Sequence, residues 1–170
     1  LPLENFELVR TILNFRKPDV VINCAAYTAV DNAESFRDLA FLINGESVGV
    51  LAAVCSELGS RFIHISTDYV FDGTKGAPYT EEDRVNPISI YGRSKLIGER
   101  QVLAADPKHV AIRLSWLFGP GRPGFPEWVL RQAASGQVRV VNHKVGCPTY
   151  REPVAVWLRK LISLPRLAGG

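Results

Sequence analysis

Tyr91 and Lys95 are the residues whose types and spacing most directly suggest chemistry. Side chains four positions apart lie on the same face of a helix, one turn from each other. A phenol loses its proton at about pH 10, and a neighbouring ammonium favours the phenolate and lowers that pKa. The pair is therefore a candidate proton donor or acceptor near neutral pH. Since the same spacing also occurs on many solvated helix faces, its meaning depends on the residues that the fold brings to it.

The elements that must position this pair alternate between strands and helices. Short β-branched runs predict strands buried on both faces, at residues 19–24, 61–66 and 109–114. Apolar residues at helical spacing predict helices at 3–16, 36–58, 89–105, 127–134 and 154–162, and a further short strand is expected at 138–141. Gly, Pro and small polar residues predict loops at 25–35, 72–87 and 119–126, and a frayed end from Pro165. The alternation predicts an α/β fold built on a parallel sheet.

The apolar spacing also predicts which helix faces are buried. The expected stripes are Leu8, Ile12 and Phe15 on the first helix and Leu39, Ile43, Val50 and Val54 on the second.

Composition narrows the classes of function. The 170 residues are 46% hydrophobic and 22% charged, which is enough for one domain with a substantial core. No secretory signal and no apolar run of about 20 residues is visible, so we expect a cytoplasmic protein without a membrane segment. The net charge of +3 is modest and scattered, which argues against a nucleic-acid surface. Methionine is absent, even at position 1, and we expect the chain to be part of a longer protein.

The three cysteines, Cys24, Cys55 and Cys147, are far apart and form no Cys-x-x-Cys or zinc-like spacing. We expect buried, inert thiols rather than reactive or metal-binding ones.

Three of the predicted strands end in residues suited to binding, and the carboxyl ends of parallel strands share one edge of a sheet. Small residues at 25–28 allow a cofactor to approach the backbone, or alternatively allow close strand–helix packing. The hydroxyl of Thr67 can bind a substrate oxygen, although such a residue also serves as a turn or helix cap. Trp116 can stack on a flat ligand, or belong to the core.

Five stretches together resemble the extended short-chain dehydrogenase/reductase family, and within it the dTDP-4-dehydrorhamnose reductase branch. They cover nearly the whole chain and include Ser-Thr-Asp-Tyr-Val-Phe-Asp-Gly and Val-Gly-Cys-Pro-Thr, which are specific to this branch. The matching segments are Val20–Glu34, Ile65–Gly73, Asn86–Glu99, Arg113–Pro120 and Val140–Tyr150. The resemblance implies an incomplete Rossmann-like, doubly wound parallel sheet in residues 1–118, which would bind NAD(P). Residues 119–170 would form part of a small C-terminal substrate domain.

The resemblance also implies a catalytic set of Thr67, Tyr91 and Lys95. Tyr91 would protonate the C4 oxygen of a keto-sugar as hydride arrives. Lys95 would lower the pKa of Tyr91 and hold the nicotinamide ribose hydroxyls. Thr67 would hydrogen-bond the substrate oxygen, and Asn44 would support the proton path.

The implied ligands are NADPH or NADH and a nucleotide-sugar, most directly dTDP-4-dehydro-L-rhamnose. The cofactor would lie against Ala25, Ala26, Tyr27, Thr28, Tyr91 and Lys95. The sugar nucleotide would contact Thr67, Asp68, Tyr69 and Trp116, with Val30 and Asp31 close by. A homodimer, with Mg²⁺ at its interface, is left open. The glycine-rich turn that holds the pyrophosphate in this family does not occur in residues 1–170, so we expect this chain alone to bind NADPH less tightly than an intact reductase.

Two alternatives stay open at this point. One is an epimerase or dehydratase acting on another nucleotide-sugar, although epimerases usually carry a Ser-rich segment in place of residues 66–71. The other is a non-catalytic, reductase-like regulatory subunit resembling the β subunit of methionine adenosyltransferase. The presence of Thr67, Tyr91 and Lys95 favours a catalyst over the second alternative.

Overall fold

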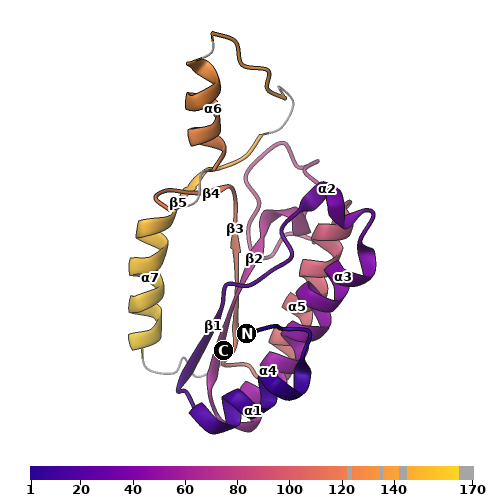
Figure 1. Cartoon of the computed structure of the whole chain (residues 1–170), viewed down its shortest axis with the longest axis vertical. Coiled ribbons are helices and arrows are strands. Elements are labelled where there is room, and N and C mark those ends of the chain that lie inside the picture. The colour runs from indigo at the N-terminus through magenta and orange to yellow at the C-terminus, as the bar shows by residue number, and fades with distance from the viewer. Residues whose placement is uncertain (122–123, 135, 142–144, 165–170) are drawn as a thin grey trace. The chain divides into compact units, whose positions relative to one another are not determined.

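The computed structural model describes residues 1–121, 124–134, 136–141 and 145–164. They divide into two compact units (Figure 1), of which the first holds residues 1–113 and the second holds the described residues from Leu114 onward. The predicted frayed end from Pro165 lies outside the described residues.

The sheet of the first unit has the order β1 (Val20–Asn23), β2 (Arg61–Thr67) and β3 (Val110–Leu114). β1 and β2 run parallel, with Val20 opposite Arg61 and Asn23 opposite His64. The three predicted strands are confirmed, each within one residue at either end. Because β2 is the central strand, its residues are buried along most of its length.

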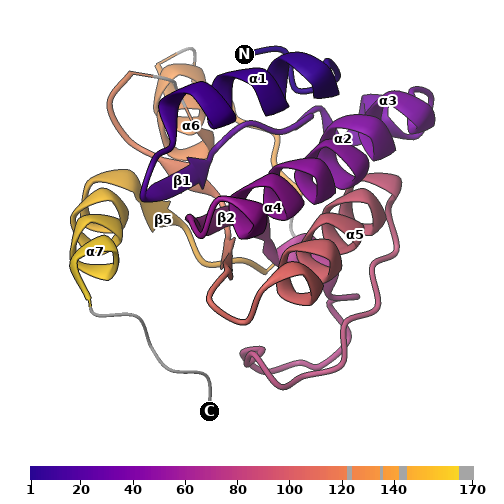
Figure 2. The same cartoon turned by 90° about the horizontal axis from the view of Figure 1, so that it is seen from below.

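Helices α1 (Phe6–Arg16), α4 (Ser47–Glu57) and α5 (Ile90–Ala105) lie together on one face of this sheet (Figure 2). The predicted helix at 36–58 is a continuous helical stretch made of α3 (Arg37–Phe41), a π-helical turn (Leu42–Glu46) and α4. The expected loop at 25–35 contains one short helix, α2 (Val30–Ala33). The expected loop at 72–87 is confirmed, since it contains no helix or strand.

Most positions of the predicted buried stripes were wrong by about one residue, although Val54 is fully buried as expected. On α1, Val9 and Leu13 enter the core, whereas Phe15 is 80% exposed. On the long helical stretch, Leu39 is exposed and the buried face runs through Ala40 and Asn44 to Val48, Leu51 and Cys55. Apolar residues occur at adjacent positions, as in Leu8-Val9 and Ile12-Leu13, so spacing alone does not select between two neighbouring faces.

The true faces are rich in small residues because α5 packs very closely on the long helical stretch. A Cβ added at Gly98 of α5 would lie 2.3 Å from the carbonyl oxygen of Asn44. A Cβ added at Gly92 would lie 2.2 Å from the carbonyl oxygen of Tyr69, just beyond β2. Glycine at these two positions therefore holds α5 in near backbone contact with the elements on both sides of it.

One helical stretch among the described residues, Arg37–Glu57, is long and apolar enough to cross a membrane by length and composition. The sequence analysis did not anticipate such a stretch. Half of it is buried, against α5 and β2, as is usual for the core helix of a globular domain.

The second unit contains a small parallel pair, β4 (Leu117–Phe118) and β5 (Thr149–Tyr150), with helices α6 (Phe125–Ala133) and α7 (Arg151–Ser163). The two predicted helices are confirmed, but α6 starts at Phe125, where Pro126 suits the first turn. The predicted strand at 138–141 was wrong. Val140 and Val141 are more than half exposed there, and β4 pairs with β5 instead.

Candidate active site

Helix α5 starts at a well-defined cap, and this cap fixes the position of Tyr91. The Ser89 side chain accepts a hydrogen bond from Gly92 N at 3.1 Å, and Ile90 N donates to Glu34 Oε1 at 2.8 Å. Ile90, Lys95 and Glu99 lie on the buried face of the helix. The first turn of α5 thus presents Tyr91 at the end of β2, and the next turn sends Lys95 into the interior.

Thr67 ends β2 and caps the 3-10 turn Asp68–Val70. Its Oγ1 accepts from Tyr69 N and donates to Asp68 Oδ1, both at 3.2 Å. The Thr67 side chain lies close enough to the Tyr91 phenol to act on its pKa. The ring of Tyr91 also packs edge-on against Tyr69, with 5.5 Å between ring centroids. The phenol and the hydroxyl predicted to act on one substrate oxygen therefore lie next to each other.

The pKa of Tyr91 is raised above its ordinary value, first because burial disfavours the phenolate. The neighbouring Thr67 hydroxyl works in the opposite direction and lowers this pKa, whereas the charge of Asp68 raises it further. The sequence-based expectation that Lys95 lowers this pKa is wrong for this structure. The amine of Lys95 is held elsewhere, and the phenol stays protonated, as a proton donor must be.

Lys95 is a buried lysine, with 1% of its surface exposed. Its Nζ donates to the carbonyl oxygen of Ile65 at 2.7 Å and contacts His64 Nε2 at 3.0 Å. Burial lowers the pKa of Lys95 to about 8, against the charge of Glu99, which raises it. The pKa of Lys95 is therefore much closer to neutral pH than that of an ordinary exposed lysine.

Glu99 balances the charge on this face of α5. Its carboxylate is 2% exposed and accepts two-pronged hydrogen bonds from Arg113, the shortest being 2.8 Å to Nη2. Arg113 in turn lies over the ring of Phe71 at 5.0 Å. A buried carboxylate needs such a partner, because an unpaired buried charge is strongly destabilising.

Asn44 fastens the segment 25–28 to α5. Its fully buried amide accepts from Tyr27 N at 2.8 Å and donates to Tyr27 O and Ser94 Oγ, both at 3.0 Å. Ser94 Oγ then donates to the carbonyl oxygen of Tyr91 at 2.8 Å. The Asn44 side chain thus links the backbone of Tyr27 to Ser94, and through Ser94 to the backbone of α5. Its hydrogen bonds serve this link rather than contact with a reacting atom.

The predicted cofactor segment presents small residues and open backbone. Ala25 and Thr28 are exposed, while Ala26 and Tyr27 are half-buried. Together with the phenol of Tyr91, this fits the nicotinamide and ribose part of a dinucleotide, which needs hydrogen-bond donors and close backbone approach.

The expectation of buried cysteines is confirmed for Cys55 and wrong for Cys24 and Cys147, which are exposed because they follow a strand end and lie in a loop. Among the described residues, no three His, Cys, Asp or Glu side chains gather as they would around a metal ion.

Trp116 belongs to the second unit. Its indole packs edge-on against Phe125 at 5.1 Å, and a Cβ added at Gly146 would lie 2.8 Å from the indole ring. Its φ of 45° is a left-handed conformation that is uncommon for a bulky residue.

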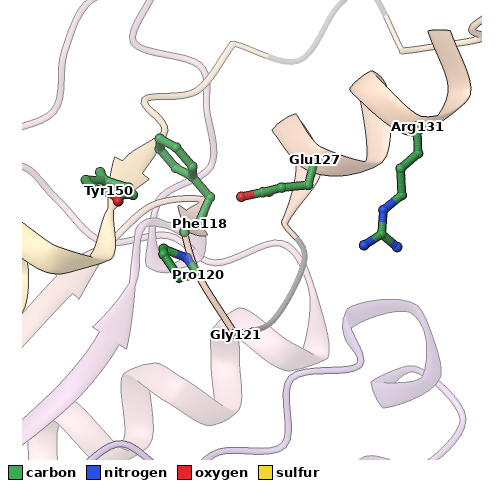
Figure 3. A pocket seen from close by; sticks show the side chains of 7 residues that line it. Phe118, Pro120, Gly121, Glu127, Arg131 and Tyr150 are labelled. Atoms are coloured by element: carbon green, nitrogen blue, oxygen red, sulfur yellow. The ribbon is translucent and has the colours of Figure 1, made fainter. Parts of the chain in front are cut away.

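A pocket of about 480 Å³ lies within the second unit (Figure 3). Helix α6 contributes Glu127 and Arg131, and Glu127 is held by a hydrogen bond from Gly124 N at 2.8 Å. The remaining lining residues are Phe118, Gly119, Pro120, Gly121 and Tyr150. This pocket was not predicted from the sequence, although a Gly/Pro loop before a helix was a usable signal.

Three buried polar residues around Lys95 were also not predicted from the sequence, namely Asn23, His64 and Glu99. Each of these residues lies inside a strand or helix that the sequence predicted. The sequence did not indicate that their polar side chains are buried.

Comparisons with known proteins agree on one family. A family model described as RmlD substrate binding domain matches residues 1–167. A dTDP-4-dehydrorhamnose reductase from Sinorhizobium fredii is 44% identical, over 89% of this chain and 53% of that protein. The chain therefore spans about half the length of the curated relatives it matches.

Solved structures agree in fold. A dTDP-4-dehydrorhamnose reductase from Clostridium acetobutylicum has a TM-score of 0.90 at 42% identity, covering 95% of this chain and 58% of that one. A dTDP-4-dehydrorhamnose reductase from Bacillus anthracis in complex with NADP has a TM-score of 0.91 at 36% identity, covering 96% of this chain and 59% of that one. The Rossmann-like α/β fold expected from the sequence is confirmed.

Proposed function

The chain belongs to the RmlD substrate binding domain family, and from this premise we propose that it is part of an NADPH- or NADH-dependent reductase of a nucleotide-sugar. The proposed substrate is dTDP-4-dehydro-L-rhamnose, whose C4 keto group is reduced to give dTDP-L-rhamnose. The relatives support this choice, because those at 40–45% identity include several dTDP-4-dehydrorhamnose reductases. The NADP-bound relative from Bacillus anthracis supports the cofactor.

In the proposed reaction, Tyr91 donates a proton to the C4 oxygen of the sugar. Burial keeps the phenol protonated until the oxygen becomes basic, and the neighbouring Thr67 hydroxyl can hydrogen-bond the same oxygen. The bound cofactor supplies the hydride. Because Thr67 caps the turn that follows β2, its hydroxyl is held in place before the substrate binds.

Lys95 serves in this proposal to bind the cofactor ribose and to restore the proton on Tyr91. Its partners, Ile65 O and His64, hold the amine one turn along α5 from the phenol. The segment 25–28, fastened to α5 by Asn44, forms the wall against which the cofactor lies.

We assign contacts with the sugar nucleotide to Asp68 and Tyr69. A contact of Trp116 with the same ligand stays a prediction from the sequence. Residues 1–118 thus form part of the NAD(P)-binding domain, and residues 119–170 form part of the substrate-binding region. A cytoplasmic location is proposed, since nucleotide-sugars and NADPH are cytoplasmic metabolites.

The observation that carries this proposal is the Tyr91 phenol beside the Thr67 and Tyr69 side chains at the end of β2, with a buried lysine one turn away. The test is to supply the complete protein with dTDP-4-dehydro-L-rhamnose and either NADPH or NADH, and to follow the nicotinamide absorbance. Substrate-dependent loss of NADPH or NADH, with dTDP-L-rhamnose as product, is the expected result. If neither cofactor is consumed with this sugar or with other dTDP-keto-sugars, the proposal is wrong.

A further inference from the structure

Lys95 ends a line of buried polar groups that starts at the edge of the sheet. Ala25 N donates to Asn23 Oδ1 at 3.0 Å, Asn23 Nδ2 lies 3.1 Å from His64 Nδ1, and His64 Nε2 lies 3.0 Å from Lys95 Nζ. Asn23, His64 and Lys95 are each at most 5% exposed. The three side chains come from β1, β2 and α5, so only the folded chain brings them together.

The direction of these hydrogen bonds fixes where the protons lie. A backbone N–H can only donate, so the atom of Asn23 that faces Ala25 N must be the amide oxygen. The amide NH2 of Asn23 then faces His64 and donates to Nδ1, which must carry a lone pair. A neutral imidazole has one N–H, and that proton must therefore be on Nε2, which faces the amine of Lys95.

We propose that Asn23 and His64 are positioning residues that set the charge of Lys95, by presenting the Nε2–H donor to its amine and so favouring the neutral form. A neutral amine accepts from His64 and still donates to Ile65 O, whereas an ammonium would place two donors against each other. This proposal rests on the proposed function only for its consequence, the role of Lys95 with the cofactor.

Burial acts in the same direction on both partners. It lowers the pKa of His64 to about 3 and that of Lys95 to about 8. The other charged group acting on Lys95 is Glu99 on its own helix, and Glu99 is neutralised by Arg113 on β3. β1 contributes only the amide of Asn23, which does not ionise.

Protonation of Lys95 then changes the hydrogen bonds at the edge of the sheet. For Lys95 to become an ammonium and keep its contact with His64, His64 must carry its proton on Nδ1 and Asn23 must turn its amide. One proton is taken up from solvent, and His64 stays neutral throughout. The turned amide no longer accepts from Ala25 N, which is thereby freed in the exposed segment 25–28. The charge of Lys95 is thus linked to a backbone donor on the predicted cofactor wall.

The direct test is nitrogen NMR on the complete protein, labelled with ¹⁵N-histidine and ¹⁵N-lysine, without substrate or cofactor. Above the Lys95 pKa of about 8, His64 is expected to show an unprotonated Nδ1 and a protonated Nε2, and its proton is expected to move to Nδ1 as Lys95 becomes charged at lower pH. One lysine Nζ, identified by its loss in Lys95→Arg, is expected to titrate below the other lysines. A protonated Nδ1 at His64 while Lys95 is neutral, or an ordinary titration of Lys95, would overturn the proposal.

The matched variant is Asn23→Asp, which replaces the amide NH2 by an oxygen of nearly the same size. A carboxylate can still accept from Ala25 N, but His64 must now donate from Nδ1, which leaves Nε2 to accept from Lys95. The pKa of Lys95 is expected to rise by about one unit or more. The control is Asn14→Asp, the same change at an exposed site on α1, which should leave the titration of Lys95 unmoved.

An equal shift of the Lys95 pKa in the control, or no shift in Asn23→Asp, would contradict the proposed role of Asn23 and His64. If Asn23→Asp does not fold, the tautomer of His64 in the unmodified protein still decides the question. Neither measurement needs turnover. A protein with the expected tautomer and titration but no reductase activity would therefore refute the proposed function and still support the role of Asn23 and His64.

Discussion

Substituting Gly98 by alanine tests whether close backbone packing of α5 positions the candidate site. In an exposed helix, glycine to alanine is favourable by about 1 kcal/mol. Here the added Cβ would lie 2.3 Å from the carbonyl oxygen of Asn44, where ordinary contact begins at 3.4 Å. The two backbones would have to separate by roughly 1 Å, and overpacking of this kind costs about 1–3 kcal/mol.

The obstacle at Gly98 is backbone, which has no rotamer to change, so we take the cost at about 3 kcal/mol. After the gain in helix propensity, Gly98→Ala is expected to destabilise by about 2 kcal/mol. For a domain of this size that corresponds to a fall in Tm of about 4–8 °C. Thermal unfolding of the complete protein, followed by circular dichroism, measures it.

Gly49→Ala is the matched control in the same helix pair. Its Cβ would meet only the end of the Gln101 side chain, 2.0 Å from Oε1, and that oxygen is buried without a hydrogen-bond partner. The Gln101 side chain can rotate away at little cost, so we expect Gly49→Ala to match or exceed the wild-type Tm. Equal losses in the two variants, or a Gly98→Ala protein as stable as the wild type, would refute the reasoning.

Two further predictions concern charged groups in the first unit. Glu99→Gln should destabilise the fold by about 3 kcal/mol, because Arg113 loses its buried counter-ion. Glu57→Gln removes the exposed partner of Arg10 and should cost less than about 0.5 kcal/mol. Urea unfolding compares the two variants, and equal losses would contradict the description of Glu99 and Arg113 as a buried ion pair. Hydrogen bonds, first that from Asn86, hold the pKa of Asp72 below its usual range. The contribution of ionised Asp72 to the order of the loop at 72–87 is therefore complete above the ordinary aspartate pKa, and it is lost only as the pH falls below that value. Limited proteolysis of Asp72→Asn should show faster cleavage within this loop at neutral pH, and unchanged cleavage would remove Asp72 from that role.

The sheet and its helices could be predicted because their signals are local. β-branched runs such as Val20–Asn23 and the Ser89 cap of α5 are contained in a few neighbouring residues. The buried faces were not local, since Val9 and Leu8 are both apolar and only packing against α4 selects Val9. The strand predicted at 138–141 failed for a similar reason, because a strand needs a partner and β4 pairs elsewhere.

The candidate site was predictable where residues near a strand end or helix start carry the signal, as at Thr67 and Tyr91. The surroundings of Lys95 were not predictable from spacing. Its contacts with His64, 31 positions away, and through His64 with Asn23 depend on strand register, in which Asn23 lies opposite His64. The same register explains why the expected effect of Lys95 on the pKa of Tyr91 was wrong, since the amine is bound to β2 instead.

The central claim is that Tyr91 donates the proton in a reduction by NADPH or NADH. It is tested most directly by Tyr91→Phe in the complete protein, with turnover measured on dTDP-4-dehydro-L-rhamnose and cofactor binding measured separately by calorimetry. Removing one hydroxyl that acts as general acid should lower kcat by about 10²–10⁴-fold. The account predicts this loss with an unchanged fold and retained cofactor binding; a Tyr91→Phe protein that turns over at the wild-type rate would contradict it.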